Sequence, residues 1–110
     1  MNFFSREEDR KGTVYYEFQK GFFDGVSFWK EDSLLLSDDM YSEIELGKLL
    51  KKLIPDYNDY EETEINEEMW KLIKEEAYSL GGKLYECIRE AEEWVDETFE
   101  EYGAFTIIGL

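Results

Sequence analysis

Residues 84–110 read LYECIREAEEWVDETFEEYGAFTIIGL, and this stretch decides the fold. Its first part repeats apolar side chains at intervals of four and three residues from Leu84 to Tyr102, which is the spacing of one face of an α-helix. Gly103 is typical of a helix end, because glycine adopts the left-handed backbone there without a steric penalty. Residues 104–110 carry no charge and are rich in apolar and β-branched side chains. They predict a buried strand that follows the helix.

A buried strand needs partner strands, and the N-terminal third of the chain offers three. Residues 13–18 are β-branched and aromatic, and residues 34–36 are three leucines. Between them, Asp24-Gly25 is a strong hairpin dipeptide flanked by the apolar segments 22–23 and 26–29. We therefore expect three short antiparallel strands, with residues 104–110 inside the same sheet.

Two further helices are predicted in the middle of the chain. Ser37 is a good N-cap for a helix that reaches Ile54, with a possible break at Gly47, and Pro55 ends it. Asn66 caps a second helix that ends before Gly81-Gly82. The predicted fold class is α+β: an antiparallel sheet of three N-terminal strands plus a C-terminal strand, packed against about three helices. At this length we expect residues 1–110 to form a single domain.

The composition excludes several chemistries. The chain has 28 acidic and 12 basic residues, a net charge of −16, no histidine and one cysteine. Without histidine there is no Ser-His-Asp triad and no His-ligated metal, and a lone Cys87 forms neither an internal disulfide nor a Cys-rich zinc site. The negative charge repels phosphate backbones, so we expect no direct binding of nucleic acid. We also expect no cofactor.

The excess charge is concentrated in one part of the chain. Residues 1–55 have 11 acids and 8 bases, whereas residues 56–101 have 17 acids and 4 bases, a net charge of −13. The helix 84–102 contains five pairs of acids at i, i+4 spacing, and each pair destabilises a helix by about 0.2–0.5 kcal/mol. Four of its acids lie in the last turns, where the helix dipole favours cations. Two interpretations remain open: a solvated face of an acidic protein, or one face that binds a basic partner.

The acidic loop 56–63 also allows a calcium interpretation. Counted from Asp56, acidic or amide side chains occupy several ligand positions of an EF-hand loop, and Glu67 occupies the last. Glu61, however, stands where the sharp turn needs glycine, and Tyr60 stands where Asp or Asn is usual. We therefore predict no specific metal site. A pair of carboxylates for acid–base chemistry cannot be selected among 28 candidates, and we predict that the protein is not an enzyme.

The candidate partner-binding residues combine the acidic loop with one row of the acidic helix. Tyr57 and Tyr60 are predicted to be exposed aromatic anchors, because tyrosine dominates many interfaces. Trp94 is expected at the edge of the apolar stripe. The predicted site comprises Asp56, Tyr57, Asp59, Tyr60, Glu61 and Glu62 in the loop, with Glu90, Glu93 and Glu97 as a steering face on the helix.

Three segments give the chain a family resemblance: the loop Asp56–Glu68, the helix Glu86–Glu101 and the ending that starts at Glu101. In these features the chain resembles small acidic bacterial immunity proteins of toxin–immunity systems, including contact-dependent growth inhibition. The resemblance implies a cytoplasmic, non-enzymatic inhibitor that binds and neutralises a basic toxin domain, such as a nuclease, by covering its active site or substrate groove. The alternative is a nucleic-acid mimic that inhibits a host DNA- or RNA-binding enzyme. No segment has the 18 to 20 apolar residues of a membrane span, so we expect no membrane partner.

Overall fold

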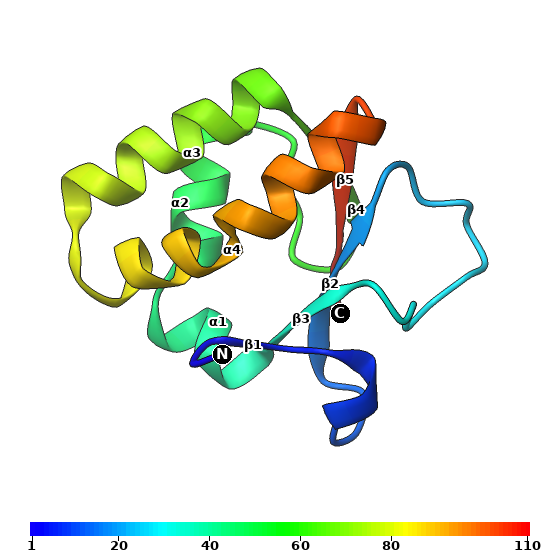
Figure 1. Ribbon diagram of the computed structural model, residues 1–110. Coiled ribbons are helices and arrows are strands. Elements are labelled where there is room, and N and C mark those ends of the chain that lie inside the picture. The colour runs from blue at the N-terminus through cyan, green and yellow to red at the C-terminus, as the bar shows by residue number, and fades with distance from the viewer.

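The computed structural model describes residues 1–110 and combines five strands with four α-helices (Figure 1). In chain order the elements are β1 (Phe4–Ser5), a 3-10 turn (Glu7–Asp9), β2 (Tyr15–Lys20), β3 (Leu34–Ser37), α1 (Asp38–Glu43), α2 (Leu46–Leu53), β4 (Glu62–Asn66), α3 (Glu67–Leu80), α4 (Gly82–Glu101) and β5 (Ala104–Ile108). The α+β class is therefore confirmed. The predicted set of strands is correct only in part.

The five strands form one antiparallel sheet in the order β1-β3-β2-β5-β4. β5 pairs with β2 on one side, where Ile108 lies opposite Glu17, and with β4 on the other side, where Ala104 lies opposite Asn66. All five residues of β5 are buried. The prediction that the apolar C-terminal segment lies inside the sheet is confirmed.

The helices cover one face of this sheet and the core lies between the two layers (Figure 1). Phe105 of β5 is at its centre, with the rings of Trp70 and Trp94 edge-on at 5.8 Å each and the ring of Phe18 stacked at 5.8 Å. Trp94 is buried, and its indole N–H donates to the carbonyl of Asp32 at 2.8 Å. The expectation that Trp94 lies at the edge of the stripe was wrong, because β5 brings Phe105 directly under it.

The segment between β2 and β3 forms a loop rather than a hairpin. Residues 22–29 form no strand, contrary to the prediction from Asp24-Gly25. Both edges of β2 are already occupied by β3 and β5, so this segment has no edge to pair with. Two strands were also missed: β1 is only two residues long, and β4 falls partly in the predicted acidic loop.

Both predicted N-caps are present, and the break between α1 and α2 has an identifiable cause. Ser37 accepts the N–H of Met40 at 3.2 Å, and Asn66 accepts the N–H of Met69 at 2.9 Å. The helix is interrupted at Glu45, whose φ of 57° is left-handed. This is two residues before Gly47, where the break was predicted. Gly47 has a different role: a Cβ there would lie 2.5 Å from the hydroxyl oxygen of Tyr41. Glycine thus makes room for a buried tyrosine.

Candidate functional site

The predicted site residues fall into two groups: the acidic loop at one end of β5, and the carboxylates of α4, of which Glu97 lies at the other end through its ion pair with Lys20. The acidic loop lies at the C-terminal end of β5. There the N–H of Gly109 donates to the backbone carbonyl of Glu61 at 3.1 Å, and the N–H of Leu110 donates to the backbone carbonyl of Asp59 at 2.9 Å. The acidic helix α4 reaches the N-terminal end of β5 through Gly103. A strand of five residues separates the groups by about 15 Å. The acids therefore do not form the single face that the sequence suggested.

Tyr57 is 7% exposed and belongs to a buried network of polar groups. The Tyr41 hydroxyl donates to Oδ1 of Asp59 at 2.5 Å and lies 2.9 Å from the Tyr57 hydroxyl, while Lys51 donates to Oδ2 of Asp59 at 2.7 Å. The ring of Tyr16 stacks on Tyr41 at 3.7 Å. The prediction that Tyr57 is an exposed anchor was wrong, because its ring and hydroxyl complete this cluster.

The network shifts the acid–base equilibria of its members. Burial raises the pKa of Tyr57 to about 12 and holds the pKa values of Tyr41 and Tyr16 above the ordinary tyrosine value. Burial opposes ionisation of Asp59, but the hydrogen bonds from Lys51 and Tyr41 outweigh it and lower the Asp59 pKa. Asp59 is therefore a charged residue whose carboxylate is bound by side chains of the same chain, which makes its role structural.

The rest of the acidic loop is exposed. Asp56, Glu61 and Glu62 are open to solvent, and Tyr60 keeps 73% of its surface exposed. The N–H of Tyr60 donates to the Asn58 side chain at 2.8 Å, which fixes the turn that presents the ring. Four of the six predicted loop residues thus remain available to a partner.

Glu90 differs from the other predicted residues of α4. Its carboxylate accepts the backbone N–H groups of Asn2 at 2.7 Å, Phe3 at 3.0 Å and Phe4 at 2.8 Å. These bonds fasten the segment that contains β1 to the middle of α4. Glu90 is therefore engaged within the chain, whereas Glu93 and Glu97 are exposed as predicted.

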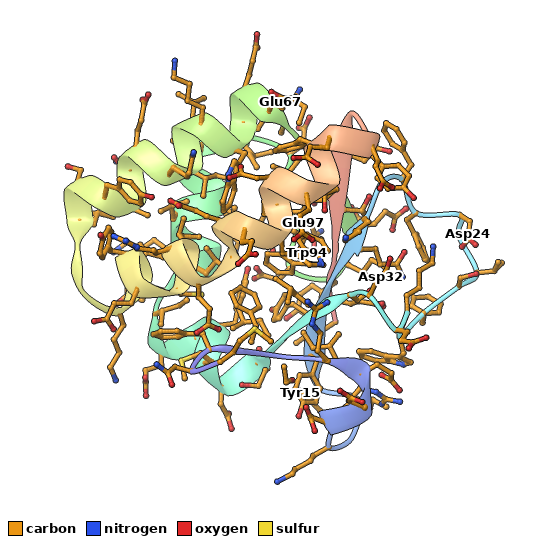
Figure 2. All side chains as sticks on the ribbon, viewed as in Figure 1. Tyr15, Asp24, Asp32, Glu67, Trp94 and Glu97 are labelled. Carbon is orange, nitrogen blue, oxygen red and sulfur yellow. The ribbon has the colours of Figure 1, made fainter.

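The C-terminal half of α4 and the start of α3 form a surface that we call the acidic end. The two helices are joined by Gly81-Gly82 and pack against each other in an antiparallel arrangement, so the last turns of α4 lie beside the first turn of α3 (Figures 1 and 2). The acidic end comprises Glu67, Glu68, Asp96, Glu97, Glu100 and Glu101, all of them exposed. One ion pair reaches it, from Lys20 to Glu97 at 3.7 Å. The last turn of α4 contains no base.

A second feature, which starts at the N-terminal end of β5 and returns to its C-terminal end, was missed in the sequence. We call residues 22–28 the apolar loop; Phe22, Val26 and Phe28 in it are 59%, 77% and 52% exposed. Gly21, the residue before the apolar loop, has a φ of 76°. A Cβ at this position would lie 2.8 Å from the ring of Tyr102, the residue that follows α4. The apolar loop therefore begins against the acidic end. The signal was present in the sequence, but its aromatic residues were interpreted as strands.

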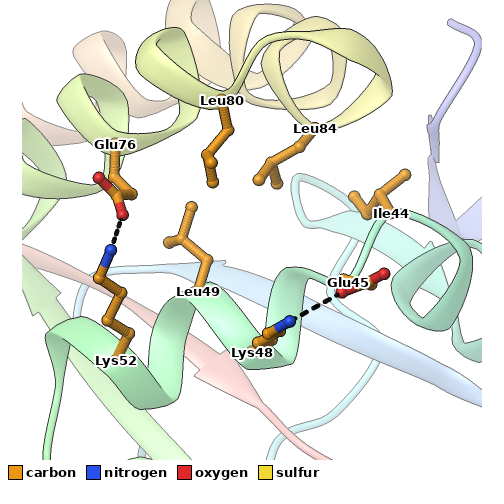
Figure 3. Close-up of a pocket in the computed structure, with 8 residues that line it drawn as sticks. All are labelled: Ile44, Glu45, Lys48, Leu49, Lys52, Glu76, Leu80 and Leu84. Carbon is orange, nitrogen blue, oxygen red and sulfur yellow. Dashed lines mark hydrogen bonds and ion pairs between the residues drawn. The ribbon is translucent and has the colours of Figure 1, made fainter.

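A groove lies at the other end of the helix pair, between α2 and the turn that joins α3 to α4 (Figure 3). It has a volume of about 310 Å³. Its lining comprises Ile44, Leu49, Leu80 and Leu84 with Glu45, Lys48, Lys52 and Glu76. Lys48 pairs with Glu45 at 3.6 Å, and Lys52 pairs with Glu76. The groove is thus an apolar depression whose charged residues are already paired with each other.

No group of three or more His, Cys, Asp or Glu side chains is placed to hold a metal ion. None of the helices combines the length and apolar character needed to cross a membrane. Comparisons with protein families, curated proteins and solved structures find no match to the chain. The function must therefore be argued from the surfaces described above.

Proposed function

We propose that this protein is a non-enzymatic binding protein that neutralises a basic protein partner, as an immunity protein neutralises a toxin. The observation that carries the proposal is the acidic end, where six exposed carboxylates make a single ion pair with the chain itself. A basic partner supplies the missing cations. A nuclease is a natural partner of this kind, because its substrate groove must be positive to hold phosphate.

The acidic end opposes the stability of the helix that carries it. Glu100 and Glu101 lie in the last turn of α4, where the helix dipole is negative and no base is present. Glu67 and Glu68 lie in the first turn of α3, where the dipole is favourable, but they add negative charge to the same surface. An arrangement that disfavours the free protein and favours a charged complex is expected of a binding surface.

The same charges would accelerate association. Complementary electrostatic fields raise association rate constants to about 10⁸–10⁹ M⁻¹s⁻¹ at low salt, and this gain is lost as salt increases. Fast capture suits an inhibitor whose target acts immediately. The alternative, a nucleic-acid mimic, has less support, because Glu90 is removed from the regular row of carboxylates by its bonds to residues 2–4.

The test measures binding to the protein encoded by the gene adjacent to that of this chain, at low and high ionic strength. The triple variant Glu97→Gln/Glu100→Gln/Glu101→Gln is expected to reduce the association rate constant by about 10-fold at low salt, with the difference shrinking at high salt. The matched control Asp56→Asn/Glu61→Gln/Glu62→Gln removes the same charge at the other end of β5, and we expect a much smaller change.

Absence of a complex at low ionic strength would contradict the proposal. Equal effects of the two triple variants would leave net charge, rather than the acidic end, as the cause of binding.

A further inference from the structure

The apolar loop carries three of the large apolar side chains that this acidic protein exposes to solvent. It extends away from the sheet, with Asp24 at its outer part (Figure 2). Phe22, Val26 and Phe28 are each more than half exposed, and Phe23 packs on Phe28 with ring centroids 5.1 Å apart. Solvent-exposed apolar groups gathered in this way are typical of interaction sites.

The loop is held in shape by hydrogen bonds at its tip. The Asp24 carboxylate accepts the N–H groups of Val26 at 2.9 Å and Ser27 at 2.7 Å, and the Ser27 hydroxyl at 2.6 Å. The Ser27 hydroxyl and these backbone groups lower the pKa of Asp24 to about 2, so the turn is intact at neutral pH. The apolar side chains are thus presented from a closed turn.

The base of the loop is fixed by side chains from the sheet. The buried Glu17 carboxylate accepts the N–H of Trp29 at 2.8 Å, that of Lys30 at 2.9 Å and the Ser33 hydroxyl at 2.7 Å. These bonds hold Trp29 at a φ of 58°, a left-handed conformation that is unfavourable for a bulky residue. The guanidinium of Arg10 lies 4.3 Å above the indole ring. A loop fixed at tip and base loses little conformational entropy when it binds.

The surroundings of the loop define what can cover it. Gly21 rests against Tyr102, so the loop begins beside the acidic end. It returns to the other end of β5, where Phe28 lies with Gly109 and Leu110, and these two residues are bonded to the acidic loop. A second copy of this chain bound through the same surface with two-fold symmetry would bring the two acidic ends together, and these would repel each other. An anionic membrane surface would be repelled in the same way. A protein with an apolar pocket inside a basic surface complements both the apolar loop and the acidic end.

We propose that Phe22, Val26 and Phe28 anchor the interface, and that they enter an apolar pocket of a protein partner whose surrounding surface is basic. This inference rests on the proposed function and adds the anchor to it. The acidic end sets the rate of association, while the apolar loop sets the lifetime of the complex, because buried aromatic contacts mainly control dissociation.

Photo-crosslinking in the native organism locates the anchor. A photoreactive phenylalanine derivative is placed at Phe28, at Glu97 and, as a control, at Tyr78, an exposed aromatic residue of α3 on the part of the helix pair away from the loop. We expect the first two positions to crosslink to the same basic protein, identified by mass spectrometry, and the Tyr78 position to leave it unlabelled.

The crosslinked protein is then purified and its kinetics measured with the chain. Phe22→Ala/Phe28→Ala is expected to raise the dissociation rate constant by about 10-fold or more, with the association rate constant changed by less than about 2-fold. Tyr78→Ala should match the wild type. All three side chains are about half exposed, and thermal unfolding confirms that the variants are folded.

The outcomes separate the two proposals. Crosslinks to a basic protein from Glu97 but not from Phe28, or an unchanged dissociation rate in the double variant, would overturn the anchor and leave the proposed function standing. Crosslinks from Phe28 to a second copy or to lipid would overturn the anchor as well. If no position crosslinks to a basic protein, both proposals fail.

Discussion

The carboxylates at the two ends of β5 have opposite surroundings. At the C-terminal end, Glu17 accepts three hydrogen bonds and Asp59 holds Tyr41 and Lys51. At the N-terminal end, Glu100 and Glu101 have neither a cation nor a hydrogen-bond donor of the chain. Glu17 and Asp59 use their negative charge to build the structure, whereas Glu100 and Glu101 present theirs to solvent.

This difference shows that the number of acidic residues does not decide which surface can bind a partner. The groups that each carboxylate already contacts decide it. Glu90 and Asp59 belong to the acidic stretch 56–101, yet both are engaged by the protein itself. Exposed carboxylates that are not held by several hydrogen bonds of the chain are the ones most available to another molecule. Substitutions of Glu17 and of the pair Glu100 and Glu101 should therefore change the stability of the free protein in opposite directions.

The largest effect is expected for Glu17→Ala. The substitution leaves two backbone N–H groups and the Ser33 hydroxyl without an acceptor in a buried place, which should lower the free energy of unfolding by about 3 kcal/mol or more. Denaturant unfolding measures this loss. Glu93→Ala, an exposed acid of α4, serves as the control and should change stability by less than about 0.5 kcal/mol. A loss below about 1 kcal/mol for Glu17→Ala would show that the loop is not held by this carboxylate.

Alkaline pH should weaken the end of β5 that contains the tyrosine network. Tyr57 has a pKa of about 12 when folded and about 10 when unfolded, so the folded chain retains a proton that the unfolded chain loses. Its contribution to stability is complete below pH 10 and declines as the pH rises toward 12, with a slope of up to roughly 1.4 kcal/mol per pH unit for each such tyrosine. Urea unfolding below and above pH 10 measures the slope.

The variant Tyr57→Phe removes one titrating group and should give a shallower decline. The same slope in Tyr57→Phe and the wild type would exclude Tyr57 as a source of the alkaline sensitivity.

The smallest effect is expected at the acidic end, with the opposite sign. Glu100→Gln/Glu101→Gln relieves an unfavourable interaction with the dipole of α4, and should raise the free energy of unfolding by about 0.3–1 kcal/mol at low salt. Glu67→Gln/Glu68→Gln removes the same charge at the favourable start of α3 and should lower stability by a similar amount. Thermal unfolding with and without added salt measures both. A shift of the two variants in the same direction would show that general repulsion outweighs the dipole.

Local patterns predicted the parts of the fold that local physics controls. The period of α4, the caps at Ser37 and Asn66, and the uncharged run of β5 each had one simple interpretation. The segment 22–29 did not, because its hairpin signal ignores whether β2 has a free edge. β4 was missed because its alternation contains one buried apolar residue, Ile65, among polar ones, as is common in an edge strand.

The sequence predicted where the charges of the candidate site lie along the chain, but not which of these residues are engaged by the fold. Exposure of Glu93 and Glu97 followed from the helical period. The burial of Tyr57 and the use of Glu90 to bind residues 2–4 depend on contacts 16 and 86 to 88 residues apart in the chain. A pattern within one segment contains no information about contacts at such separations.

The position of β5 has a kinetic consequence. β4 makes no pairing with β2 or β3, and the sheet is continuous only through the strand that follows all the others in sequence. Registering Ile108 against Glu17 closes a loop of about ninety residues, an ordering that long-range contacts make slow. The α3–α4 hairpin needs only local contacts and can form early. We expect folding to be limited by the arrival of β5 between its two neighbours, so that β4 joins the rest of the sheet late.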